Sequence, residues 1–247
     1  MDKSDMIYGT RSVMEAVKAG KQIEKVYLQT GLTNDLMKEL VGLLRDTQVP
    51  YTWVPLEKIN RMTTKNHQGV VAVLSAVEYA SLQPLIDKAY AEGRAPFFLL
   101  LDRITDVRNF GAVARSSECA GLDGIIVEET GNAPITGDAV KTSAGALHYL
   151  PVCRVKSLKD AMKELHQNGI QIVACTEKAN HLLYELDLSG PIALLMGSEE
   201  DGIAPPLLKA CDKSAKIPMK GKIESLNISV AAAVAMYEVV RQKFYRN

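Results

Sequence analysis

The stretch FFLLLDRITDVRNFGAVARSSECAG, residues 97–121, decides the class of fold. It begins with five apolar residues in a row and continues, after a polar segment, into a helical pattern from Asn109. Short apolar runs recur downstream at residues 124–127, 170–175 and 191–197. Continuous apolar strands that alternate with helices are typical of a parallel sheet covered by helices on both faces. We therefore predict an α/β fold from Pro96 onward.

The residues before this region predict a second, smaller α/β unit. An amphipathic helix is expected to begin at the capping residue Asn34. Strand patterns are expected at residues 23–29, 49–54 and 69–77. The expected domains are thus residues 1–78 and 96–247, joined by a linker at 79–95 that is either mostly polar or helical.

Composition argues against several classes of protein. The chain has 247 residues, of which 47% are hydrophobic, enough for a large core in one or two domains. Its four cysteines form no CxxC pair and its four histidines show no ligand spacing, so we expect no metal site. The charged N-terminus and the lack of a long apolar run predict a soluble cytoplasmic protein with no membrane partner. A formal net charge of zero leaves nucleic-acid binding to local basic patches.

The residues that follow the predicted strands are the candidates for function, because ligands of parallel sheets bind beyond the carboxyl ends of the strands. After the first apolar run, Asn109 is expected to cap the next helix and Gly111 permits close backbone approach. Arg115 follows in the same helix. After the last run comes GSEEDGI, residues 197–203, which is either an acidic surface turn or a loop that contacts a ligand.

The stretch ESLNISVAAAVA, residues 224–235, places polar side chains before a run of small residues. Ser225 is expected to cap the following helix, because its hydroxyl can accept from the free amides of the first turn. Asn227 and Ser229 are weaker helix formers, so they either lie on the surface as polar residues or face a ligand at the helix N-terminus. The lysines just before this stretch suit a solvated surface or a phosphate-bearing substrate.

Several familiar catalytic motifs are absent from the sequence. It has neither GxGxxG nor GxxxxGK[ST], which disfavours a dehydrogenase of the doubly wound type and a P-loop enzyme. It also lacks HExxH and GxSxG, the patterns of zinc proteases and of α/β-hydrolases.

Three stretches resemble, in order and spacing, the three motifs of the SpoU (TrmH) family of RNA ribose 2′-O-methyltransferases. They are NFGAVARSSECAG at 109–121, LLMGSEEDGI at 194–203 and IPMKGKIESLNISVAAAVAMYEVVRQ at 217–242. The N-terminal part, from IYGTRSVMEAV at 7–17 to NHQGVVAVL at 66–74, is similar to the family's substrate-binding domain, which resembles ribosomal protein L30e. The resemblance is closest to members that methylate a guanosine ribose in 23S rRNA.

The resemblance implies a parallel α/β domain with a deep C-terminal trefoil knot of the SPOUT type, preceded by the small L30e-like domain. It implies S-adenosylmethionine as methyl donor and no metal. The residues that match cofactor-binding positions are Thr176, Gly197, Ile217, Met219 and Leu226. The implied partners are large-subunit ribosomal RNA and a second copy of the chain, paired through the knotted domain with the active site at that interface.

The residues that match the family's active site are Asn109, Arg115, Glu199, Ser225 and Asn227. The family's proposed base is the arginine, but a guanidinium pKa of about 12.5–13.8 makes a neutral guanidine near pH 7 cost roughly 7 kcal/mol. We therefore expect Arg115 to bind phosphate and to stabilise developing oxyanion charge. Asn227 and Ser225 are expected to orient Arg115 and the ribose, and Glu199 to hydrogen-bond within the cluster.

RNA contacts are expected from Arg11 in the N-terminal unit and from Lys220 and Lys222 near the third motif. Two residues depart from the family pattern, since Val107 stands where a proline is common and Glu200 where many relatives carry glycine. A positive φ at Glu200 would strain the loop. Two other functions stay open: a transfer-RNA ribose methyltransferase, and a non-catalytic RNA-binding module that has kept the scaffold.

Overall fold

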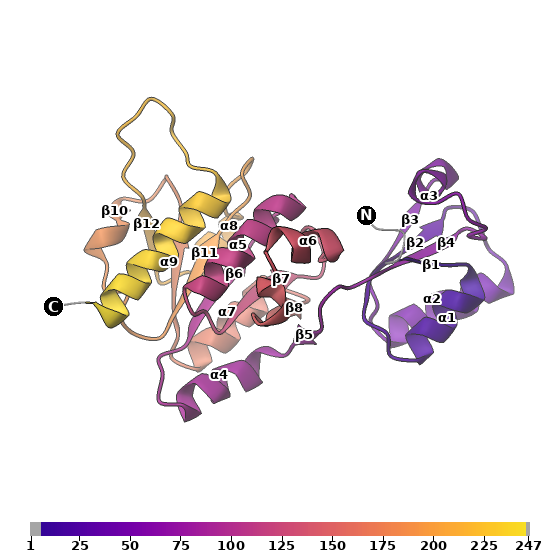
Figure 1. The fold of residues 1–247 in the computed structure, drawn as a ribbon, viewed down its shortest axis with the longest axis horizontal. Helices are drawn as coiled ribbons and strands as arrows, with labels where there is room; N and C mark the ends of the chain where they lie inside the picture. The colour runs from indigo at the N-terminus through magenta and orange to yellow at the C-terminus, as the bar shows by residue number, and fades with distance from the viewer. Residues whose placement is uncertain (1–5, 246–247) are drawn as a thin grey trace. The chain divides into compact units, whose positions relative to one another are not determined.

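The computed structural model of the chain describes residues 6–245 and divides into two compact units. The first unit contains the residues up to Glu78 together with Pro134–Asp138, and the second contains Tyr79–Ala133 and the residues from Ala139 onward. Each unit is built on a sheet of its own (Figure 1).

The first unit is a four-stranded sheet with helices on both faces (Figure 1). In the order β1-β4-β2-β3 its strands pair antiparallel, except that β2 and β3 are parallel. Val26 and Leu28 of β2 are buried against α1 and α2, whereas Tyr27 points to the other face, where α3 packs. The elements are β1 (Met6–Tyr8), α1 (Thr10–Lys18), β2 (Ile23–Gln29), α2 (Asp35–Asp46), β3 (Tyr51–Val54), α3 (Leu56–Met62) and β4 (Val70–Leu74).

The second unit is an eight-stranded sheet in the order β10-β12-β9-β11-β6-β7-β8-β5, and every neighbouring pair is parallel. Its strands are β5 (Tyr79–Ala80), β6 (Phe97–Leu101), β7 (Gly124–Glu128), β8 (Val152–Val155), β9 (Gln171–Cys175), β10 (His181–Leu182), β11 (Ile192–Met196) and β12 (Lys213–Lys216). Its helices are α4 (Leu82–Ala91), α5 (Val107–Cys119), α7 (Leu158–Gln167), α8 (Pro205–Leu208) and α9 (Ile228–Phe244), together with the part of α6 (Gly137–Thr142) from Ala139 onward. The predicted parallel α/β sheet is confirmed.

The central strands β6 and β11 are apolar throughout because both faces of the sheet are covered. Alternate side chains such as Phe98 and Leu100 pack with α4 and α7 in one core cluster. On the opposite face α5 and α9 pack against each other, and α9 contacts β11 (Figure 1). The central strands therefore sit between two helical layers, and their carboxyl ends share one edge of the sheet.

Some elements were not evident in the sequence. Residues 79–95, expected as a linker, contain β5 and α4, and α4 buries Leu82 and Ile86 in the core of the second unit. Strand β12 has the polar sequence KSAK, since only Ala215 of its four residues is buried. The C-terminal knot implied by the resemblance stays a prediction. Among residues 6–245, no helix combines the length and the apolar character that crossing a bilayer requires.

Candidate active site

Three loops meet at the carboxyl edge of the second sheet. They follow β6, β11 and β12, which are parallel strands and therefore end on the same side. Asn109 comes from the first loop and helix, Glu199 from the second loop and Asn227 from the third. Ligand sites are expected at this edge of a parallel sheet.

Side-chain hydrogen bonds join these three residues directly. Asn109 Nδ2 donates to Glu199 Oε1 at 3.0 Å, and Asn227 Nδ2 donates to the same oxygen at 2.9 Å. Asn227 Nδ2 also lies 3.1 Å from Asn109 Oδ1, its second acceptor. Residues 118 positions apart along the chain thus share one polar cluster, which we call the Asn–Glu–Asn cluster. In the described part of the chain, no donor bonds the other carboxylate oxygen, Glu199 Oε2.

The first loop sets Asn109 in the opening turn of α5. The helix begins at Val107, and its cap is Asp106, whose carboxylate accepts from the amides of Arg108 at 2.7 Å and Asn109 at 3.3 Å. These backbone bonds, chiefly that of Arg108, hold the pKa of Asp106 below its usual range. The prediction that Asn109 caps this helix is therefore wrong, and its side chain is left to the cluster. Val107 occupies the first helical position, where a proline also fits.

The second loop is a tight turn closed by two backbone bonds between Ser198 and Gly202, at 3.2 and 3.0 Å. A Cβ on Gly197 would lie 2.5 Å from the Gly202 carbonyl oxygen and would overlap the backbone of Gly202 and Ile203. Only glycine fits at position 197. Glu200 does not adopt a positive φ, so the strain considered for this residue is absent.

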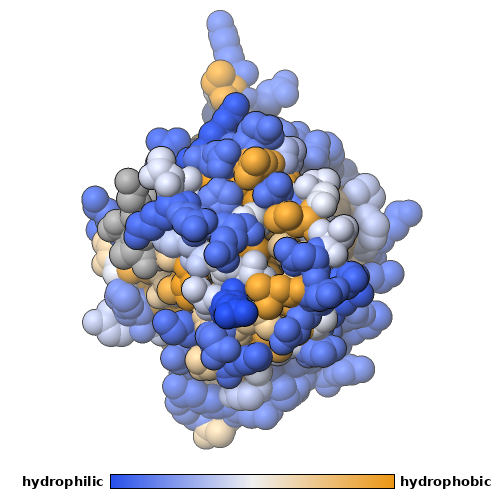
Figure 2. Space-filling view, turned by 90° about the vertical axis from the view of Figure 1, so that its right-hand side faces the viewer, coloured by the Kyte–Doolittle hydropathy of each residue, from blue (hydrophilic) through white to orange (hydrophobic). Residues whose placement is uncertain are grey.

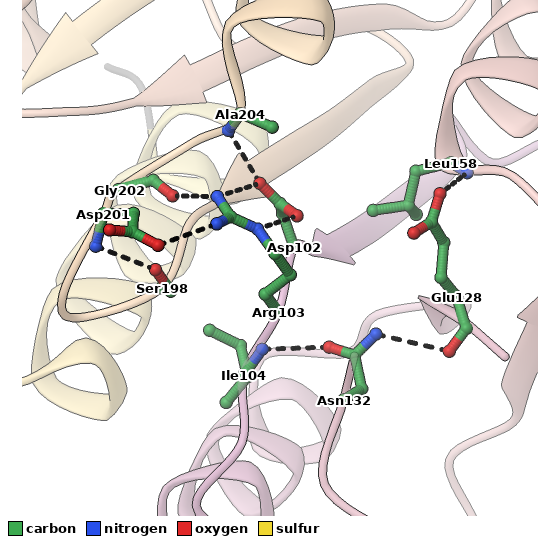
Figure 3. A network of polar contacts seen from close by, with 10 residues as sticks. All are labelled: Asp102, Arg103, Ile104, Glu128, Asn132, Leu158, Ser198, Asp201, Gly202 and Ala204. Atoms are coloured by element: carbon green, nitrogen blue, oxygen red, sulfur yellow. Dashed lines mark hydrogen bonds and ion pairs between the residues drawn. The ribbon is translucent and has the colours of Figure 1, made fainter. Parts of the chain in front are cut away.

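Asp102 and Arg103, the first residues after β6, tie the first loop to the second (Figure 3). The guanidinium of Arg103 donates to both Asp102 oxygens, at 3.0 and 3.1 Å, and also to Asp201 and the Gly202 carbonyl, each at 3.0 Å. The buried Asp102 carboxylate accepts from Ala204 N at 2.7 Å. Sequence reasoning missed this pair, although it directly follows a buried strand.

The third loop ends in the cap of α9. The helix begins at Ile228, and Asn227 caps it by accepting from Ser229 N at 3.0 Å and from Ser229 Oγ at 2.6 Å. The prediction that Ser225 is the cap is wrong, because Ser225 lies too far before the first turn. Asn227 thus uses its oxygen for the helix and its nitrogen for the cluster.

A cavity of about 440 Å³ opens beside the cluster, and all five residues predicted to bind the cofactor line it. Thr176 and Gly197 follow β9 and β11, while Ile217, Met219 and Leu226 come from the third loop. Glu199, Ser225 and Asn227 also line it. Burial raises the pKa of the nearby Cys175 thiol to about 12, so this part of the lining is uncharged. A second cavity, of about 250 Å³, is lined by Arg103, Asn109 and Glu199, among others.

Other predicted residues lie outside this cluster. Ser225 makes no hydrogen bond among residues 6–245, although it lines the cavity. Arg115 is exposed on α5, six residues and about 240° of helical rotation beyond Asn109. It lines neither of the two cavities described. Lys220 and Lys222 are exposed in the third loop, and Arg11 is exposed at the start of α1 in the first unit.

Comparison with known proteins assigns the family. Residues 96–237 match the SpoU rRNA methylase family, and residues 6–80 match the RNA 2′-O ribose methyltransferase substrate-binding domain. A protein of Bacillus subtilis (strain 168) named as the TrmH family tRNA/rRNA methyltransferase YacO is 34% identical over 239 residues, which cover 97% of this chain and 96% of that protein. The chain belongs to the SpoU methyltransferase family.

Two solved methyltransferase structures share the fold. The SpoU methyltransferase AviRb from Streptomyces viridochromogenes, in complex with the cofactor AdoMet, has a TM-score of 0.62 and 27% identity, covering 98% of this chain and 91% of that chain. An AdoMet-bound rRNA methyltransferase from Sinorhizobium meliloti has a TM-score of 0.61 and 24% identity, covering 99% and 90%. The resemblance seen in the sequence is confirmed at the level of family and fold.

Proposed function

We propose that this SpoU family member transfers a methyl group from S-adenosylmethionine to a ribose 2′-hydroxyl of structured RNA, with a guanosine of 23S rRNA as the first substrate to test. The observation that carries the proposal is the Asn–Glu–Asn cluster at the rim of a ligand-sized cavity. Cavities of about 300–1,000 Å³ suit small-molecule cofactors, and this one measures about 440 Å³.

The residues around the cavity fit S-adenosylmethionine. Ile217, Met219 and Leu226 offer apolar surface for a base, and the missing side chain at Gly197 lets the turn up to Gly202 pack closely beside the cavity. The lining contains one lysine, Lys178, and a larger number of acidic residues, which favour a ligand that carries sulfonium and ammonium charges: Glu177, Glu199, Glu200, Asp201 and Glu224. When bound, the cofactor supplies an electrophilic methyl group.

The protein's own part in such a reaction is to position the 2′-hydroxyl and to help remove its proton. Two amide donors fix Glu199 Oε1, so the carboxylate has one orientation and presents Oε2 to an incoming hydroxyl. We assign Glu199 and the two asparagines to orienting the ribose. Ser225, on the same rim, is assigned to substrate contact.

Arg115 reaches such a site most simply from a second copy of the chain. It is exposed on α5 and lines neither cavity of its own chain, and the family resemblance implies a dimer with a shared active site. The exposed side of α9, which packs beside α5, carries an apolar stripe of Val230, Tyr237 and Phe244, exposed by 47%, 50% and 70%. Residues seven apart share one helix face, and exposed apolar stripes mark interfaces.

A mixing experiment tests this arrangement. Arg115→Ala and Asn227→Ala should each be inactive alone. When equal amounts of the two are unfolded and refolded together, half of the dimers should contain one chain of each kind. Each mixed dimer has one of its two sites with both residues intact, so about a quarter of wild-type activity should return. No recovery, with mixed dimers demonstrated by mass spectrometry, would mean that Arg115 acts within its own chain or that no dimer-shared site exists.

The role of Arg115 is tested separately by the pH dependence of Arg115→Lys. A phosphate clamp predicts a loss of rate that does not change with pH, because lysine keeps the positive charge but not the bidentate geometry. Activity that recovers steeply with pH would favour a general base instead.

The remaining alternatives are separated by two measurements. Calorimetric titration with S-adenosylmethionine should detect binding, whereas a non-catalytic RNA-binding module need not bind it. Mapping 2′-O-methyl groups in cells that lack the protein should reveal a missing mark in 23S rRNA. If a 2′-O-methyl group is missing from transfer RNA instead, transfer RNA is the substrate.

A further inference from the structure

One face of the first unit carries three lysines that form no ion pair among residues 6–245. The carboxylate of Glu24 is nonetheless near, since burial raises the pKa of Tyr27 and Glu24 raises it further. On the side of the sheet where α3 packs, Tyr8 of β1 and Tyr27 of β2 both pair across strands with Val71 of β4. The two tyrosines therefore flank Val71 on the same face. Because neighbouring strands lie about 4.8 Å apart, the two backbones that carry these rings are about 10 Å apart.

Lysine side chains lie over both rings. The Nζ atoms of Lys25 and Lys58 are 6.0 and 5.9 Å from the centre of the Tyr27 ring, and that of Lys65 is 5.1 Å from the centre of the Tyr8 ring. Attraction between cation and aromatic ring holds the three ammonium groups above the sheet. We call Lys25, Lys58 and Lys65 the lysine face.

Within residues 6–245, no member of the lysine face forms an ion pair. The opposite side of the unit differs, since Lys18 pairs with Glu15 at 3.8 Å and Lys38 pairs with Asp35 at 3.1 Å. A formal net charge of zero for the whole chain is therefore compatible with a local group of lysines, unpaired in the described part of the chain, on the α3 side of this sheet.

Three ammonium groups on one surface, without ion pairs to the described residues, suit a polyanion. The side of the molecule drawn in Figure 2 is mostly hydrophilic, with apolar residues in small, separate areas. Phosphate oxygens are bound by lysine as a mobile point charge, and such contacts position a nucleic acid without reading its sequence.

We propose that the lysine face binds the phosphate backbone of the substrate RNA outside the methylated nucleotide. This inference rests on the proposed function, because it takes RNA to be the substrate. It adds to that function a surface on the α3 side of the sheet, separate from Arg11, Lys220 and Lys222. The contact is sequence-independent, so it contributes affinity and salt dependence and leaves the choice of nucleotide to the second unit.

Two matched triple variants of the full chain test the proposal. Lys25→Ala, Lys58→Ala and Lys65→Ala together remove the lysine face. Lys18→Ala, Lys21→Ala and Lys38→Ala remove equal charge from the α1 and α2 side of the same unit. Binding of each variant to a 23S rRNA transcript is measured by filter binding across a series of salt concentrations, with circular dichroism and S-adenosylmethionine affinity as controls of folding.

The first triple variant should bind the transcript about tenfold or more weakly at 0.1 M salt. Its slope of log affinity against log salt should fall by about three, one for each lysine. The second triple variant should stay within about twofold of wild type, with an unchanged slope. If both variants bind the transcript equally weakly, or if the first binds it with wild-type affinity, the proposal that the lysine face binds RNA is refuted.

Failure of the proposed function has a different signature. A wild-type chain that binds the transcript, depends on the lysine face and transfers no methyl group would refute the proposed reaction and leave the lysine face in place. If the wild-type chain methylates the transcript and the first triple variant binds it normally, the proposed reaction stands and the role of the lysine face is refuted. A wild-type chain that binds no RNA overturns both.

Discussion

Replacing Gly197 with alanine should separate the geometry of the active site from the general stability of the fold. The added methyl group meets the backbone of Gly202 and Ile203, which cannot rotate away as a flexible side chain would. Overpacking of this kind costs about 1–3 kcal/mol, and we expect the upper end because the obstacle is backbone. For a protein of this size, about 3 kcal/mol corresponds to a fall in the thermal midpoint of roughly 6–12 °C.

Two other glycines supply controls for this variant. Gly202, in the same turn, has a φ of +68° and open space around it, so Gly202→Ala should cost only the conformational strain of about 1–2 kcal/mol. Gly190 has open space and no positive φ, so Gly190→Ala should leave the midpoint unchanged or raise it slightly. The thermal midpoint should therefore be highest for Gly190→Ala, lower for Gly202→Ala and lowest for Gly197→Ala.

The functional readout is methyl transfer at a temperature below all the midpoints measured for the three variants. Gly197→Ala displaces the turn that carries Glu199, and a misplacement of about 1 Å at a reacting centre can cost about 10²-fold in rate. Gly190→Ala should retain the wild-type rate. A Gly197→Ala protein with wild-type stability and rate would refute the close approach between Gly197 and Gly202 on which this reasoning depends.

Three further variants probe other parts of the second unit. Arg103→Gly keeps a residue suited to its φ of +59° and removes the guanidinium that holds the second loop, so methyl transfer should fall at least about tenfold; the control Arg94→Ala, which also breaks bonds to two carboxylates, should lose stability only. Asn227→Ala should lose about 1 kcal/mol of stability through its helix cap and nearly all methyl transfer, with cofactor affinity retained in calorimetry; wild-type rates would contradict its assignment. Burial lowers the pKa of Lys243 from 10.5 to about 8 in the folded protein. Between these pH values Lys243 is protonated in the unfolded chain and largely neutral in the folded one, so the free energy of unfolding should rise with pH. Urea titrations of Lys243→Met should show a smaller rise than those of the wild type.

The parallel sheet and its functional edge were predictable from the sequence because their causes are local. Runs such as Phe97–Leu101 are apolar throughout only if both faces are buried, and that requirement implies helices on each side. The direction of parallel strands then places the following loops at one edge. Asn109, Glu199 and Asn227 meet there, at distances of 2.9–3.1 Å.

The predicted cap of α2 is confirmed, since Asn34 accepts from Met37 N at 2.8 Å, but the two caps at the site were not predictable because several polar residues compete for each one. Asp106 outcompetes Asn109 at α5, and Asn227 takes the place expected for Ser225 at α9. Strand β12 escaped notice because its polar sequence lacks the apolar pattern of a central strand. The Asp102–Arg103 pair depends on contacts with residues about 100 positions away, which no local pattern contains.

The same cap residues explain why structure and chemistry are coupled in this site. Asn227 ends a loop and begins α9 with its oxygen, and only the nitrogen that remains is available to Glu199. Asp106, by capping α5, frees the side chain of Asn109 for the same carboxylate. The start of α5 fixes the amide of Asn109, and the start of α9 fixes the amide of Asn227. Because both amides donate to Glu199, its orientation depends on the two helix caps. A substitution that moves either cap therefore changes the reacting geometry even when it touches neither cofactor nor RNA, and its effect on rate should exceed its effect on stability.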